Sequence, residues 1–78
     1  MRFRYTVAVG CGDLGRRVTI RFRLPGSGLS DVVGVLETCD DRTFGVRDRS
    51  GATRVIERAD VVSARVVPPP EPGPRPER

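Results

Sequence analysis

The chain has 78 residues, with 14 arginines, no lysine and 10 acidic residues, so its formal net charge is +4. A chain of this length makes at most one domain and buries too little surface to enclose a deep substrate pocket. We therefore expect no catalytic residue in it, and the lack of histidine removes the usual general base and most zinc-ligand sets, so no metal site is expected either.

The positive charge is concentrated in the N-terminal third. Residues 1–24 carry six arginines and one acid, a net of +5, whereas residues 25–67 carry six arginines and seven acids, a net of −1. A local positive patch attracts phosphate groups or an acidic partner. Strand faces in water are also commonly charged without any ligand, so both interpretations stay open.

The first 13 residues allow two interpretations. Residues 3–9 fit an extra edge strand, and they fit a loose lead-in equally well because Gly10-Cys11-Gly12 separates them from the next strand. The sequence does not decide between them.

Strict alternation of apolar and polar side chains begins at residue 17 and continues to residue 24, which is typical of a half-buried strand. The apolar face comprises Val18, Ile20, Phe22 and Leu24. The outer face comprises Arg17, Thr19, Arg21 and Arg23.

Four further strands are predicted at residues 29–39, 43–49, 53–57 and 61–67, separated by short turns. Gly34 inside the first of these predicts a bulge or a sharp bend, Gly51 predicts a tight hairpin, and residues 58–60 predict a single 3-10 turn before the last strand. Five closely spaced strands favour an all-β fold, a small and partly open barrel over residues 14–67. Residues 68–78 hold six of the seven prolines and are expected to be a disordered linker or tail.

The two cysteines, Cys11 and Cys39, lie far apart in sequence and outside any CxxC motif. Since Met1 is followed by Arg2 and Arg4 without a long apolar run, we expect a cytoplasmic protein with no membrane partner. In that reducing setting both thiols are expected to be free and at least half buried, and a disulfide between them is not expected.

Several segments, taken in order, resemble a known family. These are GRRV at 15–18, RLP at 23–25, DRSG at 48–51 and ADVVSARVVPP at 59–69. Together they are similar to the SH3-like N-terminal domain of actinobacterial GNAT-family acetyltransferases, which are often described as histone acetyltransferase-like. The resemblance implies an accessory domain that precedes a catalytic acetyltransferase domain, and it implies no cofactor in this chain, because the acetyl-CoA loop belongs to the other domain.

Two partners follow as hypotheses. The first is the catalytic domain or another protein surface. The second is nucleic acid, whose phosphates would be contacted by the exposed arginines Arg16, Arg17, Arg21 and Arg23. With only four aromatic residues, two of them needed in the core, a proline-peptide groove or a methyl-lysine cage is not expected. The alternative for the arginines is pairing with Asp31, Glu37 or Glu57 across the sheet, and the oligomeric state stays open.

Overall fold

The computed structural model describes residues 6–68 and has an all-β fold. Its main strands begin and end close to the predicted bounds, because alternation and turn chemistry are both local signals. The elements are β1 (Thr6–Val7), the 3-10 helix η1 (Cys11–Asp13), β2 (Arg17–Arg23), β3 (Leu29–Cys39), β4 (Thr43–Asp48), β5 (Thr53–Glu57), the 3-10 helix η2 (Arg58–Asp60) and β6 (Val61–Val66).

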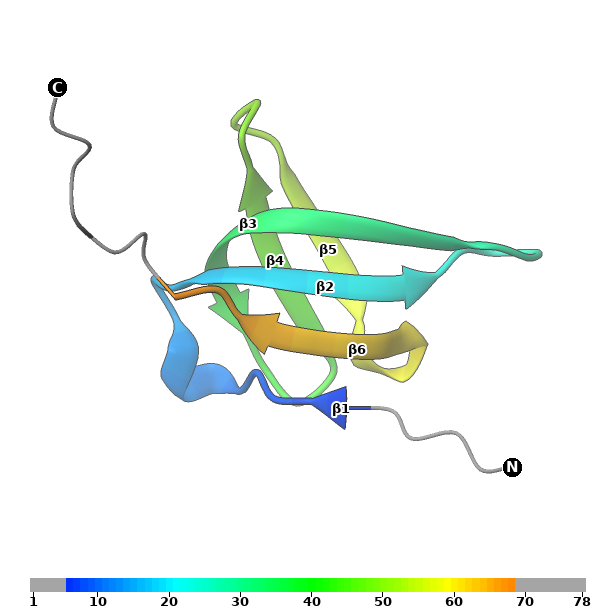
Figure 1. Ribbon diagram of the computed structural model, residues 1–78, viewed down its shortest axis with the longest axis horizontal. Helices are drawn as coiled ribbons and strands as arrows, with labels where there is room; N and C mark the ends of the chain where they lie inside the picture. The colour runs from blue at the N-terminus through cyan, green and yellow to red at the C-terminus, as the bar shows by residue number, and fades with distance from the viewer. Residues whose placement is uncertain (1–5, 69–78) are drawn as a thin grey trace, which may run out of the picture.

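The strands form one curled sheet in the order β1-β6-β2-β3-β4-β5. All neighbouring pairs are antiparallel except β1 with β6, which is parallel. Figure 1 shows β4 and β5 passing behind β2 and β3 at a steep angle, so the sheet wraps around its own inner face. Within residues 6–68 the outermost strands β1 and β5 do not pair with each other, and the sheet is therefore not closed.

The core lies on the inner face, where the alternating apolar residues of several strands meet. Its members are Val9, Val18, Ile20, Phe22, Val32, Leu36, Phe44, Val46, Ile56, Val61 and Ala64. Both phenylalanines predicted to be internal are buried. Leu24, predicted on the same face, instead follows the end of β2 and is exposed, because the strand stops before Pro25 and the alternation ends with it.

The N-terminal segment contributes to the fold through a short strand. Thr6 and Val7 pair with Ser63 and Ala64 of β6, and Val9 reaches the core. Gly10-Cys11-Gly12, which separates this strand from β2 as the sequence indicated, leads into and begins η1. Residues 3–5 of the ambiguous segment, and residues 69–78 of the expected tail, lie outside the described residues.

Gly34 marks a close approach of two strands. It pairs regularly with Val18 and Asp48, and an ideal Cβ on it would lie 2.0 Å from the carbonyl oxygen of Arg47. The register shift in β3 occurs two residues later, between Leu36 and Thr38. The glycine is therefore required by backbone proximity, while the bulge that bends the strand has moved toward its end.

The cysteines correct one prediction. Cys11 and Cys39 form a disulfide with their Cα atoms 5.3 Å apart, so no free cysteine is present among residues 6–68. The curl of the sheet brings the end of β3 against η1, which sequence spacing did not reveal. A cross-link between residues 28 positions apart restricts the unfolded chain and stabilises the fold by about 3–4 kcal/mol in the chain-entropy treatment.

Candidate interaction surface

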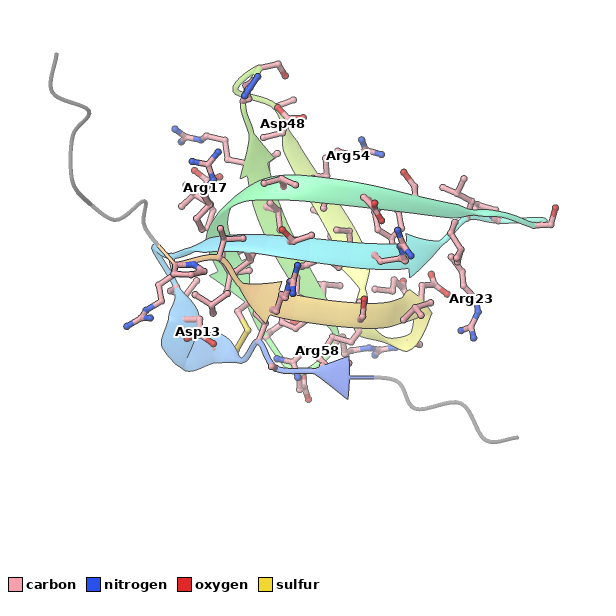
Figure 2. All side chains as sticks on the ribbon, viewed as in Figure 1. Asp13, Arg17, Arg23, Asp48, Arg54 and Arg58 are labelled. Atoms are coloured by element: carbon pink, nitrogen blue, oxygen red, sulfur yellow. A yellow bond between two sulfur atoms is a disulfide. The ribbon has the colours of Figure 1, made fainter. Side chains whose placement is uncertain are left out.

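The outer face of β2 carries the predicted arginines, spread along the whole strand. Arg17, Arg21 and Arg23 are all exposed and alternate as the sequence indicated. Arg17 and Arg23 are at opposite ends of β2 (Figure 2), which places their Cα atoms about 20 Å apart at the rise of an extended strand. Arg16 precedes the strand, where its Nε lies 4.0 Å from Asp13 Oδ1. The four arginines therefore do not converge on one point.

Arg21 is paired within the sheet. Its Nε donates to Asp31 Oδ1 at 2.9 Å and its Nη2 donates to Asp31 Oδ2 at 3.3 Å, from directly opposite positions on β2 and β3. The hydrogen bond from Arg21 lowers the pKa of the Asp31 carboxyl below its ordinary value. Because both side chains are in water, the pair adds little stability. It does neutralise the middle of the predicted arginine row.

A shallow concavity lies between β2, β3, β4 and the turn that joins β4 to β5. It was not predicted from the sequence. Its floor contains Val33 and Val35, which remain 45% and 40% exposed. Its lining comprises Arg17, Val33, Gly34, Val35, Arg47, Asp48, Arg49 and Ser50. We call this concavity the outer-face groove.

Strand register builds the centre of the groove. Val35 on β3 lies opposite Arg17 on β2 and opposite Arg47 on β4. Residues directly opposite one another in antiparallel strands project from the same face of the sheet. An exposed valine is thus flanked on both sides by arginine.

The charges of the groove are only partly neutralised. Arg47 forms an ion pair with Glu37, whose other carboxylate oxygen accepts a hydrogen bond from Thr53 Oγ1 at 2.9 Å. The side chains of Arg17 and Arg49 are exposed and have no hydrogen bond or ion pair to any other residue between 6 and 68. The groove therefore combines an apolar floor with two available cations.

Asp48 also lines the groove, and its carboxylate is occupied by the hairpin. Oδ1 accepts hydrogen bonds from Ser50 Oγ at 2.6 Å, from Ser50 N at 2.9 Å and from Ala52 N at 3.2 Å. These bonds, chiefly the one from the Ser50 hydroxyl, lower the pKa of Asp48 below its ordinary value. The turn ends at Gly51, whose φ of 91° suits glycine.

A second, smaller concavity lies on the β6 side of β2. It is lined by Thr19, Arg21, Asp31, Ser63, Ala64 and Arg65. Because the Arg21–Asp31 pair occupies it, Arg65 is its one cation without an acid partner among the described residues. This site is more nearly neutral than the outer-face groove.

The lining of neither concavity includes a histidine or a cysteine. Between residues 6 and 68, no three His, Cys, Asp or Glu side chains lie close enough to share a metal ion. The described part of the chain also contains no helix of the length and hydropathy needed to cross a bilayer.

One signal in the sequence could have revealed the groove. The run Val32-Val33-Gly34-Val35-Leu36 is apolar at both odd and even positions. In a strand with one buried face, the second apolar set is left in water, where it forms an exposed apolar patch.

Comparison with known proteins identifies one family. Residues 12–65 match the family described as the Rv0428c N-terminal Sm-like domain. The matched range begins inside η1 and ends within β6, and it includes the outer-face groove. No curated protein and no solved structure matches the chain.

Proposed function

This chain belongs to the Rv0428c N-terminal Sm-like domain family, and from that premise we propose that it is a non-catalytic module that binds a protein surface through its outer-face groove. In this proposal it is the N-terminal accessory domain of a GNAT-type N-acetyltransferase, or a stand-alone relative of that domain. Its partner is then the catalytic acetyltransferase domain.

The observation that carries the proposal is the row Arg17–Val35–Arg47 with its neighbour Val33. Val33 and Val35 lie outside the buried core, yet they are grouped on one exposed face. An apolar centre with a charged rim is the usual anatomy of a protein–protein interface. The available cations Arg17 and Arg49 favour a partner surface that carries carboxylates beside an apolar patch.

The GNAT assignment draws on sequence. The segments GRRV, RLP, DRSG and ADVVSARVVPP resemble the accessory domain of that enzyme group, and the matching family is described as an N-terminal domain. The proline-rich residues 68–78 have the composition of a semi-rigid spacer between domains. A cytoplasmic setting is part of the proposal.

The reading frame beyond Arg78 gives the first test. A continuation that encodes an acetyltransferase domain supports the proposal. That catalytic domain should then be titrated into the isotope-labelled 78-residue chain, with amide resonances followed by NMR. We expect shifts centred on Val33, Val35 and Arg47, and we expect V33S/V35S to abolish them.

Val55 offers a matched control for this titration. It is an exposed valine at 68% on β5, outside the outer-face groove. V55S should bind as the unaltered chain does. Equal loss in V55S and V33S/V35S, or shifts confined to other strands, would contradict the assignment of the groove.

Nucleic acid is the second candidate function. The observation that favours it is a group of exposed arginines with no ion pair among residues 6–68, which includes Arg17, Arg49 and Arg65. Such cations neutralise backbone phosphates without reading sequence. Phe22 and Phe44 are both buried, so they are not available to stack on bases.

A fluorescent single-stranded oligonucleotide separates the two functions. Binding that weakens steeply with salt, is lost in R17Q/R49Q/R65Q and survives in the Asp31-paired control R21Q would establish the second function. If binding is lost in R17Q/R21Q/R23Q but kept in R17Q/R49Q/R65Q, the nucleic acid would contact the arginines along β2 instead. No binding at low salt would remove nucleic acid altogether.

A further inference from the structure

The Cys11–Cys39 disulfide lies against a fixed guanidinium. Arg58 Nη2 is 3.2 Å from Cys39 Sγ and 3.6 Å from Cys11 Sγ. The same guanidinium lies over the ring of Phe44, with Cζ 4.5 Å from the ring centroid. Figure 2 labels Arg58 and draws the disulfide in yellow beside η1.

The backbone of Arg58 is anchored, but its guanidinium is not fully hydrogen-bonded. Its backbone N donates to the carbonyl of Arg42 at 2.8 Å, which anchors η2 at the end of β5. Its Nε is buried and has no hydrogen-bond partner among residues 6–68. The Arg58 guanidinium thus leaves one buried donor without a hydrogen bond and directs Nη2 at two sulfur atoms. Its hydrogen bonds to the neutral disulfide are weak, because disulfide sulfur is a weak acceptor.

A thiolate would be a stronger hydrogen-bond acceptor for the Arg58 guanidinium. Opening the disulfide places negative charge on sulfur, and a hydrogen bond to a charged acceptor is roughly twice as strong as one to a neutral acceptor. A neighbouring arginine is one of the features that stabilise protein thiolates. The surroundings of the disulfide therefore suit its reduced form.

We propose that Cys11–Cys39 is a thiol–disulfide exchange site that reacts with dithiol reductants. The reductant's thiolate attacks Sγ of Cys11, which is the exposed member of the pair, while Cys39 is half buried. The bond between the two sulfurs breaks, and its electron pair leaves with Cys39 Sγ as a thiolate beside Arg58. A stabilised leaving thiolate accelerates exchange.

The second half of the reaction completes the electron balance. The other thiol of the reductant, as a thiolate, attacks the reductant sulfur in the mixed disulfide and closes the reductant's own disulfide. Cys11 is released as a thiolate and takes up a proton. In total, two electrons pass from the dithiol to the two cysteine sulfurs. Of the two protons that the dithiol loses, one ends on Cys11 and the other goes to solvent, while Cys39 remains a thiolate beside Arg58.

Reduction would release one defined segment. The disulfide fastens η1 to the end of β3. Without it, the residues before η1 are held by the two-residue β1–β6 pair, the bond from Ala8 N to Ala64 O at 2.8 Å and the burial of Val9. The outer-face groove contains neither cysteine, so this site is separate from the surface proposed for the protein partner.

Dithiothreitol provides a direct test on the full 78-residue chain. The rate of reduction at pH 7 is followed by quenching, alkylation and mass measurement. We expect R58Q to slow reduction by about tenfold, given how exchange rates depend on the leaving thiol, and R58K to restore part of the rate. A variant that had simply lost its fold would be reduced faster, so the direction of change separates the two causes.

Arg54 supplies the matched control. It is a second arginine beside a phenylalanine ring, with Cζ 5.9 Å from the centroid of Phe22, and it makes no contact with the disulfide. R54Q should be reduced within twofold of the unaltered rate. Glutathione trapped as a mixed disulfide should be found on Cys11.

Three results would overturn the proposal. They are an unchanged rate in R58Q, or a faster one when its circular dichroism matches that of the unaltered chain; glutathione attached mainly to Cys39; and two free thiols in protein purified in air without reductant.

Discussion

The two faces of β3 both carry apolar residues, but one face is buried and the other is exposed. Val32 and Leu36 point inward and are 5% and 0% exposed, while Val33 and Val35, their immediate neighbours, remain 45% and 40% exposed. The inner pair is required by the core, since burying apolar surface is what holds so small a domain together. The outer pair lies outside the core, and this contrast is the reason that we propose a binding role for it.

The largest expected effect lies on the inner face. Leu36→Ala removes a fully buried side chain and should lower the free energy of unfolding by about 2–5 kcal/mol. Denaturant titration followed by circular dichroism measures it. Val35→Ala on the outer face is the control, and similar losses in both variants would show that the two faces do not differ.

Gly34 tests how closely the backbones of β3 and β4 approach each other. Gly34→Ala forces a Cβ into the backbone of Arg47 and should cost about 1–3 kcal/mol of unfolding free energy. Gly12→Ala is the control, because no atom lies within 4 Å of the added carbon there. Thermal melts that do not distinguish the two variants would contradict the close approach.

The outer valines should separate stability from binding. V33S/V35S is expected to change the unfolding free energy by only about 0.5 kcal/mol per site, as is usual for surface substitutions, while the NMR shifts on adding the partner disappear. A loss of several kcal/mol of unfolding free energy in the same denaturant titration would show that these valines contribute to the core.

The smallest effect concerns acid. The pKa values of Asp31, Asp40 and Asp48 are lowered from 3.8, in Asp40 chiefly by the backbone N–H of Arg42 and then by that of Thr43. A carboxyl whose pKa is lower in the folded chain contributes stability above pH 3.8 that is lost as the pH falls through its folded value. Melting temperatures should therefore decline gradually below about pH 4, and D48N should decline less.

Some features followed from sequence because they are local. The bounds of β3 and β5, the turn at residues 58–60 and the burial of Phe22 and Phe44 follow from alternation and turn residues. Leu24 departed from the pattern because its strand ended one residue early. The outcome for each of these depends on neighbours within a few positions.

Other features depended on register and curvature, which single-residue patterns do not encode. The row Arg17–Val35–Arg47 exists only because three strands align at one level. The disulfide depends on the curl of the sheet, which brings together residues 28 positions apart. Arg21 and Asp31 were among the groups considered for pairing, and their pairing removes one member of the predicted cationic row.

The position of β6 also governs the order in which the chain can acquire its structure during synthesis. β2 to β5 are joined in sequence and pair with their successors, so each hairpin can form as it leaves the ribosome. β6 is made last yet lies between β1 and β2. Until residue 66 has emerged, one edge of β2 has no pairing strand and the core lacks Val61 and Ala64, so the unpaired edge of the nascent domain is exposed to pairing with other chains.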